Sequence, residues 1–204
     1  MHTTENPLQN EDFLRCADFH GHVCPGLAIG YRAARAGLDR LKTHRSPDEE
    51  LVAEVETDAC GADAVQVLSG CTFGKGNFIH RDRGKQAFTF YDRGSGQGVR
   101  VAMKQGAFAP EPRQRELFAK VREESATSEE LREFWELQRQ KSQELLEMAP
   151  EELFSFQDVQ RSVPDKARIE PSEPCSACGE PTMATKLVAI GERKLCLDCA
   201  DDHA

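Results

Sequence analysis

Four cysteines near the C-terminus have the spacing of a zinc site. They form two Cys-x-x-Cys pairs that residues 179–195 separate: Cys175 with Cys178, and Cys196 with Cys199. Each pair places two thiolates on one tight turn, and zinc takes four such ligands in a tetrahedron. Residues 185–196 have the pattern of a short hairpin that returns the second pair to the first. The spacing therefore predicts a structural zinc ion with four thiolate ligands, which folds a segment too small to fold alone.

Residues 20–24 hold a second set of metal-ligating side chains: His20, His22 and Cys24. In an extended chain these alternate positions project to one face, where imidazole and thiolate ligands could converge on one ion. Pro25 suits the first position of a helix, so the Cys24 sulfur would lie at a helix N-terminus. The partial positive charge there favours the thiolate over the thiol. We therefore take Cys24 and His22 as candidate catalytic residues.

Two further cysteines, Cys60 and Cys71, bracket a short helix that the sequence predicts at residues 61–70. One short peptide rarely surrounds an ion alone, so a real site should draw on both segments. The alternative is that Cys60 and Cys71 are small buried hydrophobic residues. We expect a second metal ion, zinc, to be held by a subset of five residues: His20, His22, Cys24, Cys60 and Cys71.

The elements that must position these residues indicate an α+β core. The strand at 51–57 alternates apolar and acidic residues, which predicts one solvated face. The helical pattern after residue 113 is interrupted near Thr127 or Ser128, either of which could cap a second helix. In full, the pattern predicts helices at 11–19, 24–42, 61–70 and 113–148, and strands at 51–57, 86–92 and 98–104.

A proline-rich connector divides the chain. Three prolines and few large apolar residues occupy residues 163–174, which is typical of a linker. We therefore expect a metal-binding core domain at residues 1–165 and a zinc-finger domain at residues 166–204.

Composition and charge argue against several classes of protein. Hydrophobic residues make up 39% of the 204 residues, so a packed core is feasible. No run approaches the roughly 18 apolar residues of a membrane span, and the first residues lack the apolar stretch of a secretory signal. The net charge of −9 disfavours nucleic acid as a partner. Eight cysteines without a secretory signal indicate a reducing compartment, so we expect a cytoplasmic protein with metal or thiol chemistry.

Three motifs together resemble one known family. They are FHGHVCPGLAIGYRAA at residues 19–34, ETDACGADAVQVLSGCTFGKGN at 56–77, and CSACGE with LCLDCA at 175–180 and 195–200. In this order they are similar to the formylmethanofuran dehydrogenase E-subunit family, over roughly residues 11–203. The resemblance implies a thioredoxin-like α+β core with a mixed five-stranded sheet and a C-terminal treble-clef zinc finger. It also implies an active-site metal among His20, His22, Cys24, Cys60 and Cys71.

The family name comes from a molybdenum or tungsten enzyme of methanogenesis, and a fold does not transfer a reaction. Our first hypothesis is an accessory or metal- or sulfur-handling partner of a molybdenum- or tungsten-dependent oxidoreductase, with the finger as docking surface. The second is a small enzyme that uses an open zinc or the Cys24 thiolate. The third is a regulatory module that binds a protein partner through the finger. We also expect a homodimer.

Overall fold

The computed structural model describes residues 6–160 and 162–202. The chain divides into two compact units, one that ends at Lys166 and one that begins at Ala167. Within the described residues, no helix is long and apolar enough to cross a membrane.

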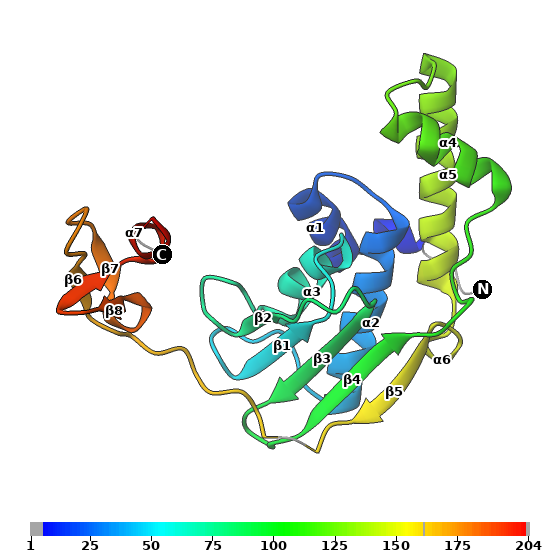
Figure 1. Cartoon of the computed structure of the whole chain (residues 1–204). Helices are drawn as coiled ribbons and strands as arrows, with labels where there is room; N and C mark the ends of the chain where they lie inside the picture. The colour runs from blue at the N-terminus through cyan, green and yellow to red at the C-terminus, as the bar shows by residue number, and fades with distance from the viewer. Residues whose placement is uncertain (1–5, 161, 203–204) are drawn as a thin grey trace. The chain divides into compact units, whose positions relative to one another are not determined.

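A five-stranded mixed sheet forms the centre of the N-terminal unit, in the order β2-β1-β3-β4-β5 (Figure 1). β1 pairs with β2 in parallel, and the other three pairs are antiparallel. This confirms the α+β prediction with a mixed sheet, and the hairpin β3–β4 forms where it was expected. Sequence patterns missed β2 and β5. The strands are β1 (Leu51–Val55), β2 (Phe78–His80), β3 (Ala87–Asp92), β4 (Gly98–Met103) and β5 (Phe154–Asp158).

Helices cover one face of this sheet, where α2 packs along the strands with α1 and α3 beside it (Figure 1). α2 begins at Pro25, as predicted, and buries most of its residues. The break in the long helical pattern is also confirmed, because Thr127 and Glu130 form a capping box at the start of α5. The helices are η1 (Pro7–Gln9), α1 (Glu11–His20), α2 (Pro25–Leu41), α3 (Gly61–Ser69), α4 (Pro112–Arg122), α5 (Ser128–Glu147) and α6 (Pro150–Leu153).

The predicted solvated face of the first strand is wrong, since all five residues of β1 are buried. β1 lies between β2 and β3, so neither of its edges is free. Its acidic residue Glu54 is only 2% exposed. The Glu54 carboxylate accepts hydrogen bonds from Arg81 at 3.1 Å and from the Tyr91 hydroxyl at 3.2 Å. These partners offset the cost of burying the carboxylate, and so the strand tolerates a charge in the core.

The C-terminal unit is small, and its described residues form two short hairpins, one short 3₁₀ helix and one α-helix. The hairpin β8–β9 forms at the place predicted for it. The buried cluster comprises Cys175, Leu195, Cys196 and Ala200, half of it cysteine. Such a small core needs a metal to hold it. The elements are β6 (Ser172–Pro174), β7 (Pro181–Met183), η2 (Ala184–Lys186), β8 (Val188–Ile190), β9 (Arg193–Leu195) and α7 (Leu197–Asp201).

Candidate metal centres

The four C-terminal cysteines converge. The sulfurs of Cys175, Cys178, Cys196 and Cys199 all lie within 4.8 Å of one another. The first pair lies on the turn after β6, and the second pair lies at the start of α7. Backbone amides of Cys196 and Ala177 donate to the Cys175 sulfur at 3.3 and 3.5 Å. These amides lower the pKa of the Cys175 thiol to about 6, which favours the thiolate that zinc requires.

Three of the five candidate ligands of the N-terminal unit also converge. The ligand atoms of His20, Cys24 and Cys60 all lie within 4.8 Å of one another. His20 is the last residue of α1, whereas Cys24 and Cys60 are the residues that precede α2 and α3. His20 Nε2 lies 3.8 Å from the Cys24 sulfur. One imidazole and two thiolates suit zinc, and the ends of three helices bring them together.

The segment that carries His20, His22 and Cys24 is not extended, so the prediction of three side chains on one face is wrong. α1 continues through His20 and ends at Gly21, whose φ of 92° is left-handed. The chain then turns before α2 begins. This turn brings His20 and Cys24 together and leaves His22 exposed, with its ring centroid 5.5 Å from that of Trp135.

His22 and Cys71 lie outside the convergent group. The His22 ring still neighbours the site, at 4.5 Å between its centroid and that of His20. Cys71 is fully buried in the hydrophobic core, and this burial raises the pKa of its thiol. Cys71 belongs to the hydrophobic core cluster and its sulfur is not part of the convergent group, which fits the packing alternative. Cys16, also fully buried, has its pKa raised to about 12 by burial.

Asp63 is a site residue that sequence patterns missed. Its Oδ2 lies 2.7 Å from His20 Nδ1, on the side of the ring opposite the sulfurs. With Nδ1–H donating to this carboxylate, Nε2 is free to face the sulfurs. Burial by itself would lower the pKa of His20, but Asp63 and Cys60 outweigh it and raise the pKa. The sequence contains one signal that could have identified Asp63, namely its spacing from Cys60. Asp63 follows Cys60 by one helical turn and so shares its face.

The pKa values of the Cys24 and Cys60 thiols differ from what the helix terminus alone predicts. Cys24 accepts the Leu27 amide at 3.4 Å, as expected for a residue that caps α2. Its thiol also donates to Cys60, and this hydrogen bond raises the pKa of Cys24. The same bond lowers the pKa of Cys60 to about 5, helped by His20. When no metal is bound, this hydrogen bond therefore favours the thiolate on Cys60 and the thiol on Cys24.

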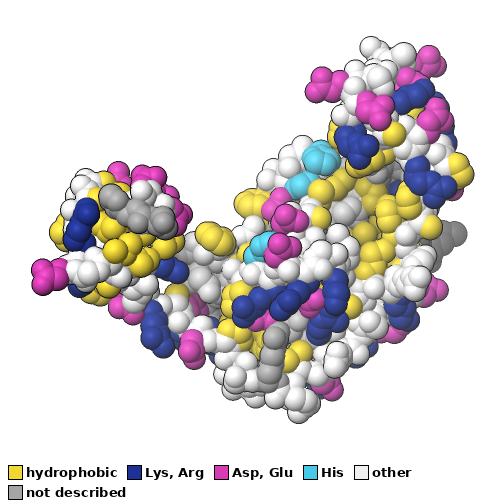
Figure 2. All heavy atoms as spheres, viewed as in Figure 1, with side chains coloured by type: hydrophobic (Ala, Val, Ile, Leu, Met, Phe, Trp, Pro, Cys, Tyr) yellow, Lys and Arg dark blue, Asp and Glu magenta, His cyan; other side chains and the backbone are white. Residues whose placement is uncertain are grey.

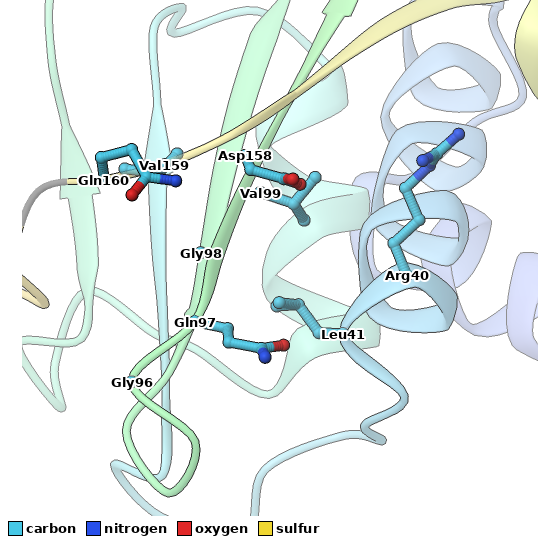
Figure 3. Close-up of a pocket in the computed structure, with 9 residues that line it drawn as sticks. All are labelled: Arg40, Leu41, Gly96, Gln97, Gly98, Val99, Asp158, Val159 and Gln160. Carbon is cyan, nitrogen blue, oxygen red and sulfur yellow. The ribbon is translucent and has the colours of Figure 1, made fainter.

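An apolar pocket of about 470 Å³ adjoins this group, and both Cys24 and Cys60 line it. A second pocket, of about 400 Å³, lies at the other end of α2 beside Arg40 and Leu41 (Figure 3). The turn between β3 and β4 and the end of β5 complete that second pocket, and neither cysteine nor histidine is among its described lining residues. We therefore locate the candidate site at the N-terminal end of α2.

The fold and the two groups of convergent cysteines together define the class of protein. It is an α+β metal-binding protein with a C-terminal four-cysteine zinc finger. Residues 19–155 match the family described as "FmdE, Molybdenum formylmethanofuran dehydrogenase operon", and the chain belongs to this family. Residues 168–203 match the "Prokaryotic dksA/traR C4-type zinc finger". The resemblance drawn from the three motifs is thereby confirmed.

Two known proteins are similar to this chain over most of its length. A protein of Archaeoglobus fulgidus named "Probable S-adenosyl-L-methionine-binding protein" is 36% identical over 202 residues, which are 93% of this chain. This chain spans about half of that protein, 52% of its length. The crystal structure of a tungsten formylmethanofuran dehydrogenase FmdE-like protein from Syntrophus aciditrophicus superposes with a TM-score of 0.58 and 26% identity. That match covers 97% of this chain and 96% of the other.

Proposed function

We propose that the N-terminal unit binds one zinc ion through His20, Cys24 and Cys60, and that the protein is a zinc-dependent enzyme acting on a small molecule. The observation that carries this proposal is the convergence of these three ligands from two distant segments within 4.8 Å. Among residues 6–160 and 162–202, no further cysteine, histidine or carboxylate joins the group. Three protein ligands with one open position are typical of catalytic zinc, whereas the four thiolates of the finger are typical of structural zinc.

The neighbouring residues support a site prepared for chemistry. Zinc would supply a Lewis acid that polarises a bound group. Asp63 holds the His20 ring in one tautomer, and the N-terminal ends of α2 and α3 stabilise the thiolates of Cys24 and Cys60. His22 is the candidate acid–base residue, because its exposed ring lies 4.5 Å from that of His20.

Metal analysis of the full chain tests this proposal. We expect two zinc ions per chain in the wild type and one in Cys60→Ser. Cys71→Ala serves as the matched control, because it removes a cysteine from the same unit but from outside the convergent group, and it should retain two. Cobalt substitution adds a spectroscopic check, since an open site and a four-thiolate site give different visible spectra. A wild-type chain that binds one ion, or a Cys60→Ser variant that binds two, contradicts the proposal.

A second candidate function is an accessory role beside a molybdenum- or tungsten-dependent oxidoreductase. The similarity to a protein described as tungsten formylmethanofuran dehydrogenase FmdE-like favours it. In this role the finger would contact the partner, and the protein would act in the cytoplasm as a homodimer. Purification of the tagged full chain from its own cells should then recover a molybdenum or tungsten enzyme, and Cys178→Ser should lose it. Light scattering of the purified chain tests the dimer.

S-adenosyl-L-methionine is the ligand named for the Archaeoglobus relative. Its sulfonium and ammonium groups outweigh its single carboxylate, so the molecule is a net cation that carboxylates of a protein would attract. The described residues that line the pocket beside Cys24 and Cys60 include no aspartate or glutamate. We therefore propose that this pocket selects a different ligand, and we expect calorimetric titration with S-adenosyl-L-methionine to show no binding.

A further inference from the structure

The pocket beside Cys24 and Cys60 has predominantly apolar walls. Its apolar residues come from α2, β4, the segment before α4, and both long helices α4 and α5: Ile29, Met103, Phe108, Phe118, Phe134 and Leu137. Figure 2 shows hydrophobic side chains gathered in the hollow between these long helices and the sheet. A pocket of about 470 Å³ has the size of a small organic ligand, and such walls favour its apolar part.

The charges around the pocket favour an anion. Apart from the two thiols, Arg115 is the one ionisable side chain among the described lining residues. The N-terminal ends of α2 and α3 add partial positive charge at Cys24 and Cys60, where Pro25 and Gly26 form part of the wall. Two thiolates neutralise a zinc ion, and the Asp63 carboxylate is not among the described lining residues, so Arg115 and the helix ends are the positive groups that face the pocket.

Gln86 provides an unused hydrogen-bond acceptor. It lines the same pocket, and its Oε1 atom is buried without a hydrogen-bond partner among the described residues. An unpaired buried acceptor costs free energy that a suitable donor recovers. A ligand with one N–H or O–H group at the right place would provide that donor.

We propose that this pocket binds a small organic anion that has an apolar body and a hydrogen-bond donor, with its anionic head toward the metal site. This inference rests on the proposed zinc site, because two of the residues that would hold the ion, Cys24 and Cys60, line the pocket. The apolar body lies between α2, α4 and α5, Arg115 attracts the negative charge, and Gln86 accepts the hydrogen bond. The ligand class is that of N-acylated amino acids and comparable amido carboxylates.

Four probe compounds separate these features in the zinc-loaded full chain. N-acetylphenylalaninate has a negative charge, an amide N–H and an apolar ring. N-acetylphenylalaninamide lacks the charge, 3-phenylpropanoate lacks the amide N–H, and N-acetylglycinate lacks the ring. We expect calorimetry to show the first binding most tightly. Loss of the charge should weaken binding about tenfold or more, loss of the hydrogen bond about threefold to tenfold, and loss of the ring about tenfold or more.

Variants assign each preference to its residue. Gln86→Leu, which is close in size, should abolish the preference for N-acetylphenylalaninate over 3-phenylpropanoate. Arg115→Gln should reduce the preference for the anion over the amide. Arg122→Gln is the matched control, because it removes a positive charge from the same helix outside the described lining of the pocket. Thermal unfolding of each variant verifies that it is folded.

The outcomes distinguish this inference from the proposed function on which it rests. If the chain holds two zinc ions but binds the amide as tightly as the anion, or binds none of the probes, the ligand inference is overturned and the zinc site stands. If the chain holds only the zinc of the finger, the proposed site itself fails. A Gln86→Leu variant that keeps the full preference for the amide N–H overturns the role of Gln86.

Discussion

Gly30 of α2 and Gly61 of α3 meet backbone to backbone. A Cβ atom on Gly30 would lie 2.2 Å from the carbonyl oxygen of Gly61, closer than any real contact. Because neither residue has a side chain, the second turn of α2 and the first turn of α3 approach each other closely. Cys24 and Cys60, which precede these helices, are therefore held beside each other. The geometry of the candidate metal site thus depends on a contact between two glycines, which have no side chain that could bind a metal or react.

Gly30→Ala should disturb this close approach. The added methyl group forces the helices apart, and overpacking of this kind costs roughly 1–3 kcal/mol of unfolding free energy. We also expect weaker zinc binding at the core site, because Cys24 and Cys60 separate. Gly74→Ala is the control, since a Cβ there meets nothing within 4 Å. Chemical denaturation and chelator competition measure both effects, and a Gly30→Ala protein with unchanged stability would contradict the close approach.

Asp63→Ala should weaken zinc binding by the core site roughly 10–100-fold, as is typical for loss of a carboxylate that orients a ligating histidine. The reason is that His20 loses the hydrogen bond of 2.7 Å that holds its tautomer and ring orientation. Asp58→Ala removes an exposed carboxylate from the same segment and should have little effect. Competition with a chelator measures the affinity, and the zinc of the finger should remain in both variants. Equal affinities in the two variants would remove Asp63 from the site.

Cys60 should be the first thiol of the N-terminal unit to be alkylated once chelators have removed all metal. Its pKa is lowered to about 5, so it is thiolate at neutral pH, whereas hydrogen bonding to Cys60 raises the pKa of Cys24. Its alkylation rate should fall as the pH drops through about 5.

Peptide mapping after brief iodoacetamide treatment measures these rates at each pH. Cys24→Ala is the informative variant, because it removes the hydrogen-bond donor and should raise the pKa of Cys60. Cys16 should react far more slowly than Cys60, because its pKa is raised to about 12 and its side chain is fully buried. Modification of Cys24 before Cys60 in the wild-type chain would show that the charge lies on the other sulfur.

Cys178→Ser should release the zinc of the finger and unfold the C-terminal unit alone. The buried cluster of this unit is too small to persist without its metal. Ser176→Ala is the control on the same turn, because it removes one hydrogen bond, from the Lys194 amide at 3.2 Å, and leaves all four thiols. Zinc content and amide hydrogen exchange provide the measurements. Exchange in the N-terminal unit should not change, and a Cys178→Ser variant with a protected finger would refute the assignment.

Local patterns were sufficient for much of this protein. The spacing of the four C-terminal cysteines predicts their cluster, because each Cys-x-x-Cys turn is determined within a few residues. Pro25 marks the start of α2, and Thr127 with Glu130 marks the start of α5, since capping depends on near neighbours in the chain. The motifs likewise identified the family.

Tertiary structure decided which of the five candidate ligands meet. His22 follows a left-handed residue, Gly21, and lies outside the group that His20, Cys24 and Cys60 form, whereas Cys71 packs into the core. Asp63 becomes a partner of His20 only because α1 and α3 lie side by side. The burial of Glu54 is likewise decided by the tertiary structure, because it depends on the position of β1 inside the sheet. Sequence spacing specifies contacts within one turn or one hairpin. The contacts of Cys60, Asp63 and Glu54 instead join segments more than twenty residues apart, and only the packing of helices and strands determines them.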